Sequence, residues 1–172
     1  GAGITAVAAL VENNTSGIIS AGDADILSPK DLVGKKYGTW NDPIELAMLE
    51  TLVSDQGGDF AKVEKVPNTD ANSITPIANQ VFDAAWIYYG WDGIMAEKEG
   101  METNFFYLTD FAPAFNYYSP VIIANNDYLK ENPEEAKKVL RAIKKGYQYA
   151  MAHPEESADI LIKHAPALEG QK

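Results

Sequence analysis

The sequence contains no cysteine and only two histidines, and these gaps exclude several kinds of functional site. Without cysteine, disulfide bonds, zinc–thiolate centres and cysteine nucleophiles are ruled out. His153 and His164 lie at or near the ends of predicted helices in a lysine-rich segment, where a surface or capping role is the simplest interpretation. Phosphate-binding glycine loops, nucleophile elbows and His-Glu-x-x-His pairs are also missing. We therefore predict no catalytic residue, metal site or cofactor.

Basic residues are scarce as well. Lys and Arg total 14 against 25 Asp and Glu, which gives a formal net charge of −11. An acidic chain repels phosphate backbones and anionic lipid surfaces, so neither nucleic acid nor a membrane surface is an expected partner. Long apolar runs are lacking too, since none approaches the roughly 20 residues of a membrane span. The chain begins directly with an apolar run, and we expect it to be a piece of a longer protein.

Apolar and polar segments alternate along the chain in a way that predicts an α/β fold. Residues 4–11 are nearly all apolar, which is typical of a strand buried on both faces. Further strands are predicted in segments that alternate with helices, at 34–40, 62–66, 81–91, 104–109 and 121–124. Such alternation predicts an α/β sandwich with a largely parallel sheet. Ligands of these sheets bind at the carboxyl ends of the strands, so the loops 13–17, 39–45 and 88–92 are candidate site loops.

The clearest helix starts around Pro43. Asp42 can cap it, proline suits the first helical position, and Glu45 stands where a capping box places its acid. A second interpretation gives Glu45 a ligand-binding role, because a buried carboxylate can accept two hydrogen bonds from an aminopyrimidine-like edge. The pattern of residues leaves both interpretations open.

The stretch WIYYGWDGI, residues 86–94, places four large rings within six positions. In a strand, side chains alternate between faces, so Trp86 and Tyr88 point one way while Ile87 and Tyr89 point the other. The rings could pack in the core or form a platform on which a flat ligand stacks. Trp91 and Asp92 follow the strand, where loops carry function, and Asp92 could also cap the next helix.

Other candidate site residues stand near this stretch in the predicted topology. Tyr117 and Tyr118 supply two further rings before Pro120, and Trp40 supplies one beside the capping box. The segment ENNTSG, which includes Asn14 and Thr15, offers amides and hydroxyls. It can be read either as an ordinary turn or as a set of polar ligand contacts.

Four blocks of the sequence carry a family resemblance: AVAALVENNTSG, SPKDLVGKKYGTW, DAAWIYYGWDGI and SPVIIANNDYLKENPE. Together they resemble bacterial solute-binding proteins for the pyrimidine precursors of thiamine, which are similar to the fungal pyrimidine synthases. The resemblance covers nearly the whole chain. It implies the type II periplasmic-binding fold, in which two α/β lobes clamp a ligand and the whole protein has roughly 300 residues.

The resemblance also implies how this chain divides. Residues 1–27 would be the end of the first lobe, residues 28–119 a complete second lobe, and residues 120–172 the crossover and return helices of the first lobe. The uncovered face of such a fragment would favour dimerisation. The whole protein would be periplasmic or a cell-surface lipoprotein and would work with an ABC permease.

By the same resemblance, an aromatic ring stacks on the pyrimidine and acidic or hydroxyl groups bind its nitrogens. Matching blocks carry this role to ten residues: Trp86, Tyr88, Tyr89, Trp91, Asp92, Glu45, Asn14, Thr15, Tyr117 and Tyr118. The synthases use a histidine and a cysteine-rich motif that the matching blocks lack, so we expect a binding protein and not an enzyme. The sequence NDP, where relatives have a glycine pair before the proline, leaves the precise ligand open. The alternatives are a binding protein for another flat or sulfonate-like solute, such as riboflavin or taurine, and a pyrimidine synthase-like enzyme. A sulfonate would need a cation, and Arg141 is the only arginine.

Overall fold

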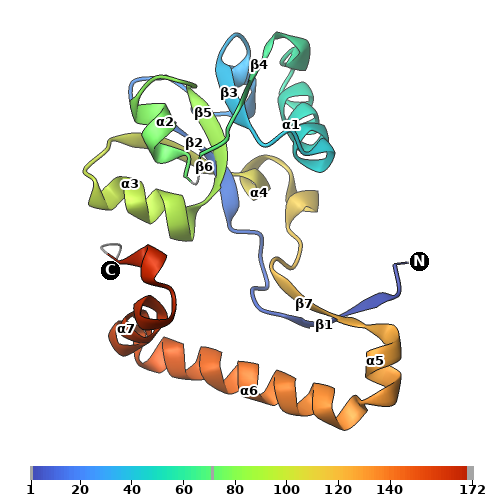
Figure 1. The fold of residues 1–172 in the computed structure, drawn as a ribbon. Coiled ribbons are helices and arrows are strands. Elements are labelled where there is room, and N and C mark those ends of the chain that lie inside the picture. The colour runs from blue at the N-terminus through green and yellow to red at the C-terminus, as the bar shows by residue number, and fades with distance from the viewer. Residues whose placement is uncertain (1, 71, 170–172) are drawn as a thin grey trace. The chain divides into compact units, whose positions relative to one another are not determined.

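The computed structural model describes residues 2–70 and 72–169, which group into two units. Residues 10–120 form the central unit, and residues 1–9 with 121–172 form the terminal unit (Figure 1). Within the described residues, none of the helices has the length and apolar character needed to cross a membrane.

The central unit contains a five-stranded sheet in the order β4-β3-β5-β2-β6. Its strands are β2 (Ser16–Ala21), β3 (Lys36–Thr39), β4 (Glu64–Pro67), β5 (Ala84–Tyr88) and β6 (Thr103–Tyr107). The pairings of β3 with β4 and β5 are parallel, whereas β2 pairs antiparallel with both β5 and β6. Four of the five strands therefore share one direction, which confirms the predicted, mostly parallel sheet.

Helices cover both faces of this sheet and enclose two apolar clusters. On one face, α1 (Pro43–Asp55) and α4 (Leu108–Phe111) pack over Ile18, Tyr37 and Trp86. On the other face, α2 (Ile74–Ala78) and α3 (Ile94–Lys98) cover Ile19 and Ile87. Neighbouring residues of β2 and β5 thus fall into different clusters, as the alternation of a strand predicts. In Figure 1, α1 lies to one side of the sheet and α2 and α3 lie to the other.

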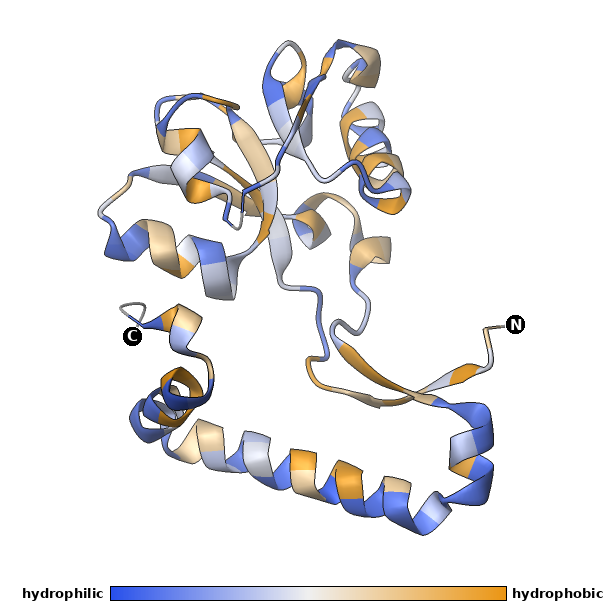
Figure 2. Ribbon diagram, in the orientation of Figure 1, coloured by the Kyte–Doolittle hydropathy of each residue, from blue (hydrophilic) through white to orange (hydrophobic). Residues whose placement is uncertain are grey.

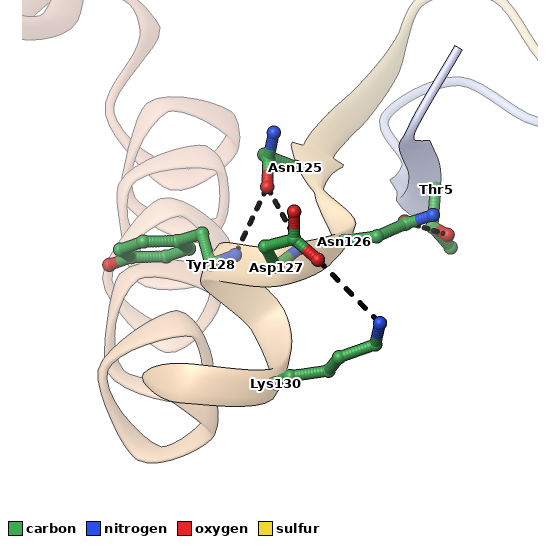
Figure 3. Close-up of polar contacts among 6 residues, drawn as sticks. All are labelled: Thr5, Asn125, Asn126, Asp127, Tyr128 and Lys130. Carbon is green, nitrogen blue, oxygen red and sulfur yellow. Dashed lines mark hydrogen bonds and ion pairs between the residues drawn. The ribbon is translucent and has the colours of Figure 1, made fainter. Parts of the chain in front are cut away.

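The terminal unit is built on an antiparallel pair, β1 (Ile4–Ala9) with β7 (Val121–Asn125), followed by three helices. These are α5 (Asn126–Glu131), α6 (Pro133–Ala152) and α7 (Pro154–His164). Asn125 caps α5, because its side-chain oxygen accepts hydrogen bonds from the backbone N–H groups of Asp127 and Tyr128 (Figure 3). Thr5 of β1 donates to the side chain of Asn126, which ties the ladder to the start of α5.

The prediction that residues 4–11 form a strand buried on both faces is wrong. β1 ends at Ala9, and all of its residues are exposed or half-buried. The physical reason is that, within the described residues, β1 has a single neighbouring strand and no layer packs over its faces. Figure 2 shows hydrophobic residues along β1 and β7 and at intervals along α6. The apolar run at residues 4–11 therefore includes a strand whose side chains remain exposed or half-buried within the described residues.

The boundaries of the two units differ from the predicted ranges. Residues 1–27 are predicted to form one group, whereas β2 lies in the central unit because both of its ladders join it to β5 and β6. The second boundary falls between Pro120 and Val121, within one residue of the expected 119/120. Residues 1, 71 and 170–172 of the predicted ranges lie outside the described residues. Which lobe each unit represents stays a prediction.

A methyl group at Gly38 is expected to destabilise the central unit. A Cβ atom there would lie 2.6 Å from Cζ of Phe82, whose side chain is 1% exposed, so the ring or the backbone would have to shift. Gly38→Ala should lower the free energy of unfolding by about 1–3 kcal/mol, measured by urea denaturation with tryptophan fluorescence.

Gly90→Ala is the matched control, since a Cβ atom at Gly90 meets nothing within 4 Å. It should change the free energy of unfolding by less than about 0.5 kcal/mol. Equal effects of the two substitutions would show that Phe82 can yield to the added methyl group.

Candidate functional site

Exposed aromatic side chains gather where the four like-directed strands end. The carboxyl ends of these strands lie at one edge of the sheet, the usual place for a ligand in an open α/β sheet. β2 begins at the same edge because Ser16 pairs with Tyr88. The chain segments at this edge carry six exposed rings: Trp40, Tyr88, Trp91, Tyr107, Tyr117 and Tyr118. We call this set of rings the aromatic edge.

The turn that carries Trp40 is held by the buried carboxylate of Glu45. The predicted capping box is confirmed: Asp42 accepts hydrogen bonds from the backbone N–H of Ile44 and of Glu45, and Glu45 Oε2 accepts one from the N–H of Asp42. Glu45 is only 4% exposed, and its two oxygens accept further bonds from Tyr37 Oη (2.9 Å), Thr39 Oγ1 (2.9 Å) and Trp40 N (3.1 Å). Protein donors thus occupy both oxygens, so Glu45 acts on the site through the turn that it holds.

Two further features complete this turn. Asn41 has a φ of 61°, a left-handed conformation that asparagine tolerates better than most residues, and its N–H donates to Thr39 Oγ1. Burial, together with the nearby Glu45 carboxylate, raises the pKa of Tyr37 well above its ordinary value, so the phenol stays protonated and can donate to Glu45.

The stretch WIYYGWDGI divides between core and surface. Trp86 is buried in the cluster under α1, and its indole Nε1 has no hydrogen-bond partner in the described structure. Tyr89 packs against Phe105 with ring centroids 4.8 Å apart, and its hydroxyl is hydrogen-bonded to Glu97. Tyr88 and Trp91, by contrast, remain exposed at the aromatic edge. Core packing therefore accounts for Trp86 and Tyr89, whereas a stacking role for Tyr88 and Trp91 stays a prediction.

Asp92 follows Trp91 in a single π-helical turn, Tyr89–Gly93, at the end of β5. The prediction that it caps the next helix is not what the structure shows. Gly93 stands at the cap position of α3, and Asp92 Oδ1 instead accepts the backbone N–H of Ser73 at the start of α2 (3.3 Å). Asp92 is half-buried, and this burial raises the pKa of its carboxyl group.

Asn14 is a structural tie between two loops of the central unit. Its side-chain oxygen accepts from the N–H and hydroxyl of Ser16, and its Nδ2 donates to the carbonyl of Phe115. Asn116 in turn accepts the backbone N–H of Asn14. These bonds place the loop before β2 beside the segment that carries Tyr117 and Tyr118.

Thr15 and the two tyrosines are more accessible than Asn14. Thr15 is exposed, and its carbonyl accepts the N–H of Tyr89 at 3.4 Å. Tyr117 lies close enough to Tyr88 for the two phenols to interact electrostatically, and burial raises the pKa of Tyr117. Tyr118 is the most exposed ring of the aromatic edge.

Four residues that shape this edge were not predicted from the sequence: Tyr37, Thr39, Asn68 and Ser73. Asn68 and Ser73 stand in the polar run after β4, and a run of Asn, Thr, Asp and Ser signals a turn without showing what it contacts. Their partners are far away in the sequence. Thr39 accepts the N–H of Asn68, and Asp92 accepts that of Ser73.

The charge around the aromatic edge is one-sided. The segments 10–16, 39–45, 67–74, 88–94 and 107–118 contain no lysine or arginine, although they include Asp92 and Glu45. The described part of the chain also has no group of three or more His, Cys, Asp or Glu side chains arranged to hold a metal ion. Rings with a carboxylate nearby suit a flat, uncharged or positively charged molecule with N–H donors.

Comparison with known proteins adds a family match. The family described as "NMT1/THI5 like" matches residues 1–157. The chain is 24% identical over 159 residues to the formylaminopyrimidine-binding protein of Halalkalibacterium halodurans, and the matched part is 92% of this chain and 48% of that protein.

Solved structures share the fold at low sequence identity. The aliphatic sulphonate binding protein SsuA of Escherichia coli matches with a TM-score of 0.72 and 19% identity over 95% of this chain and 55% of that one. The desulfurization enzyme DSZB matches with a TM-score of 0.54 and 13% identity over 94% of this chain and 59% of that one. These likenesses confirm the predicted periplasmic-binding-type α/β fold. The chain spans about half the length of these relatives.

Glu45→Gln is expected to weaken the turn that carries Trp40. An amide at position 45 keeps one acceptor oxygen and loses the negative charge, and hydrogen bonds to a charged group are stronger than neutral ones by about 1–2 kcal/mol. The free energy of unfolding should fall by about that amount in urea denaturation.

Glu50→Gln on the same helix is the matched control, because Glu50 is exposed. It should change the free energy of unfolding by less than about 0.5 kcal/mol. Equal losses in both variants would mean that the buried contacts of Glu45 contribute nothing specific.

The raised pKa of Asp92 predicts a pH dependence of stability. The folded chain holds a proton on this carboxyl more tightly than the unfolded chain does, so Asp92 contributes stability at low pH. That contribution is lost as the pH rises from the ordinary aspartate value of 3.8 through the raised folded pKa. Asp92→Asn cannot ionise and keeps an oxygen for the Ser73 N–H. The stability of this variant relative to the wild type should rise across that window and then level off, as measured by urea denaturation at stepped pH. A difference that is constant or falls would contradict it.

Proposed function

Because this chain belongs to the NMT1/THI5-like family, we propose that it forms part of the solute-binding component of a bacterial ABC importer. The proposed solute is a flat, nitrogen-containing ring, and a pyrimidine precursor of thiamine is the first candidate. The observation that carries this proposal is the aromatic edge, where Trp40, Tyr88, Trp91 and Tyr117 are exposed and where the half-buried carboxylate of Asp92 follows Trp91.

The exposed rings support stacking as the main source of affinity. Trp91 is 49% exposed although it adjoins a well-packed strand, and Tyr88 is 43% exposed in the same turn region. Large apolar rings left open to water gain free energy when a flat molecule covers them, and one stacked base is worth roughly 1–3 kcal/mol. Tyr117, beside Tyr88, adds a second surface.

Asp92 supports recognition of N–H donors on the solute. One of its oxygens, Oδ1, accepts the N–H of Ser73. A carboxylate can accept several hydrogen bonds, so an amino group or ring N–H of the solute could use the remaining oxygen. Such a bond would offset the burial that raises the pKa of this carboxyl group.

The same chemistry argues against an anionic solute such as a sulfonate. Recognition of an anion needs a cationic side chain or a suitable helix start, and the segments of the aromatic edge contain no lysine or arginine. The likeness to SsuA is a likeness of fold at 19% identity. Taurine is therefore a useful negative probe, and riboflavin tests whether a larger flat ring suits the edge better.

Binding without catalysis fits the groups present at this edge. The chain has no cysteine, and His153 and His164 belong to the helical segment of the terminal unit. We therefore propose a binding role and not a synthase activity. The formylaminopyrimidine-binding protein among the relatives supports this choice by its name.

The setting of the whole protein is also proposed. SsuA of Escherichia coli, which shares the fold, is named a periplasmic binding protein, and this supports a periplasmic location. Docking on an ABC permease is part of the same proposal. The central unit would form the second lobe and the terminal unit part of the first. A solute that binds a closed form more tightly than an open one would shift the whole protein toward closure.

Exposed apolar residues on β7 and α6 support dimerisation of this chain on its own.

Calorimetric titration of the complete gene product tests the proposed solute. Hydroxymethyl- and formylaminomethyl-aminopyrimidines, riboflavin and taurine are compared under one set of conditions. We expect a pyrimidine to bind, and we expect Trp91→Ala to weaken that binding by roughly 1–3 kcal/mol because it removes a stacking surface. Asp92→Ala should weaken it as well.

Leu27→Ala is the control for an apolar truncation outside the aromatic edge, since Leu27 is exposed in the connection from β2 to β3. It should leave the affinity unchanged. Binding of taurine or riboflavin in place of every pyrimidine would keep a solute-binding role and remove the thiamine link. Pyrimidine binding that survives Trp91→Ala intact would remove the stacking role of that ring.

A further inference from the structure

The contacts of Asn68 point to a residue that organises the aromatic edge without being part of it. We propose that Asn68 is a positioning residue, which links the turn carrying Trp40 to the turn carrying Trp91 through one chain of hydrogen bonds. The purpose of this link, a pair of rings set for a flat solute, rests on the proposed function. The link itself rests on geometry alone.

The first half of this series of hydrogen bonds runs from Asn68 to the turn after β3. Asn68 directly follows β4, and its backbone N–H donates to the carbonyl of Thr39 at 2.8 Å. The hydroxyl of Thr39 donates in turn to the buried carboxylate of Glu45, which also accepts the N–H of Trp40. Asn68 is therefore tied to the residue that precedes Trp40.

The second half runs from Asn68 to the turn after β5. Its Nδ2 donates to Oγ of Ser73 at 3.1 Å, and the N–H of Ser73 donates to Oδ1 of Asp92 at 3.3 Å. Asp92 directly follows Trp91. The series of hydrogen bonds thus connects the carboxyl ends of β4, β3 and β5, which are neighbours in the sheet.

Burial makes these bonds costly to lose. Asn68 is 9% exposed and Ser73 is 3% exposed, so water has little access to replace a missing partner. An unpaired buried polar group costs free energy of the order of a lost hydrogen bond or more. Asparagine also fits the position chemically, because its amide supplies a donor to Ser73 and an acceptor for the N–H of Asp70 (3.2 Å).

A purely local role does not account for all of these contacts. An asparagine that only shapes a turn uses its side-chain oxygen for a backbone N–H two residues ahead, as Asn68 does with Asp70. The bond from Nδ2 to Ser73 goes beyond that turn and reaches the start of α2. This bond connects the turn that carries Trp91 to the hydrogen bonds that hold the turn of Trp40.

The three tryptophans of the sequence allow a direct test. Trp40 and Trp91 are exposed at the two ends of the proposed chain, and Trp86 is buried in the core as an internal reference. In protein labelled with 5-fluorotryptophan, each ring gives its own ¹⁹F resonance, assigned by single tryptophan-to-phenylalanine variants. Asn68→Ala removes the bond to Ser73 but keeps the backbone N–H that donates to Thr39. We therefore expect it to shift the resonance of Trp91 by more than its line width, with smaller changes at Trp40 and Trp86.

Asn104→Ala is the matched control. Asn104 is a half-buried asparagine of the same sheet, and its Nδ2 donates to the carbonyls of Ala21 and Gly22 near the opposite edge. Asn104→Ala should leave Trp40 and Trp91 unshifted even where it lowers stability. Asn68→Asp, which keeps the size and can accept from the Ser73 hydroxyl, should move the Trp91 resonance back toward the wild-type position.

The outcomes separate this proposal from the proposed function. A shift of Trp91 in Asn68→Ala but not in Asn104→Ala supports the link, whichever solute binds. No shift of Trp91 in Asn68→Ala, or equal shifts of Trp91 in the two variants, overturns it. If Asn68→Ala does not fold, Ser73→Ala carries the same test, because it removes only the acceptor oxygen. Where a pyrimidine binds the wild type, Asn68→Ala should weaken that binding about fivefold.

Discussion

The position of Trp40 depends on the hydrogen bonds of one buried carboxylate, which has no salt-bridge partner within the described residues. Glu45 lies in the first turn of α1, where the helix start favours negative charge, and it accepts hydrogen bonds from Tyr37, Thr39, Trp40 and Asp42. Because such a group is costly to bury, its donors must all be present at once. That requirement ties the end of β3 to the start of α1 and leaves the ring of Trp40 at the surface.

The mixed sheet explains why the site gathers at one edge. Four strands end at this edge and β2 begins there, so loops from distant parts of the sequence meet over a short distance. Hydrogen bonds then fix the loops to one another: Asn14 joins the segment of Phe115, and Asn68 joins both Thr39 and Ser73. The exposed rings are therefore carried by turns whose backbones are firmly held, which lowers the entropy lost when a solute covers them.

Family membership and the residues of the aromatic edge bear on different aspects of the proposed function. Family membership and fold point to a solute-binding protein, but the relatives include proteins named for a pyrimidine and for sulphonates. In the proposed site, the exposed rings and the carboxylate would favour a ring with N–H donors, because recognition of a sulfonate needs a cationic side chain or a suitable helix start. The fold alone does not distinguish these solutes, since function depends on the side chains of the site.

Local patterns were sufficient for part of this description. The sequence alone determined the mostly parallel α/β fold, the capping box of Asp42 and Glu45, and the alternation that sends Trp86 and Ile87 to opposite faces, since each depends on residues a few positions apart. Only the tertiary structure decided that Tyr89 packs against Phe105 while Trp91 remains exposed. It also decided that Asn14 donates to the carbonyl of Phe115, and that Asp92 accepts from Ser73 instead of capping α3. It also revealed Asn68, which no local pattern marks. The physical reason is the same in each case: these side chains find partners on strands and loops far away in the sequence, and only the pairing of the strands brings those partners within reach of a hydrogen bond.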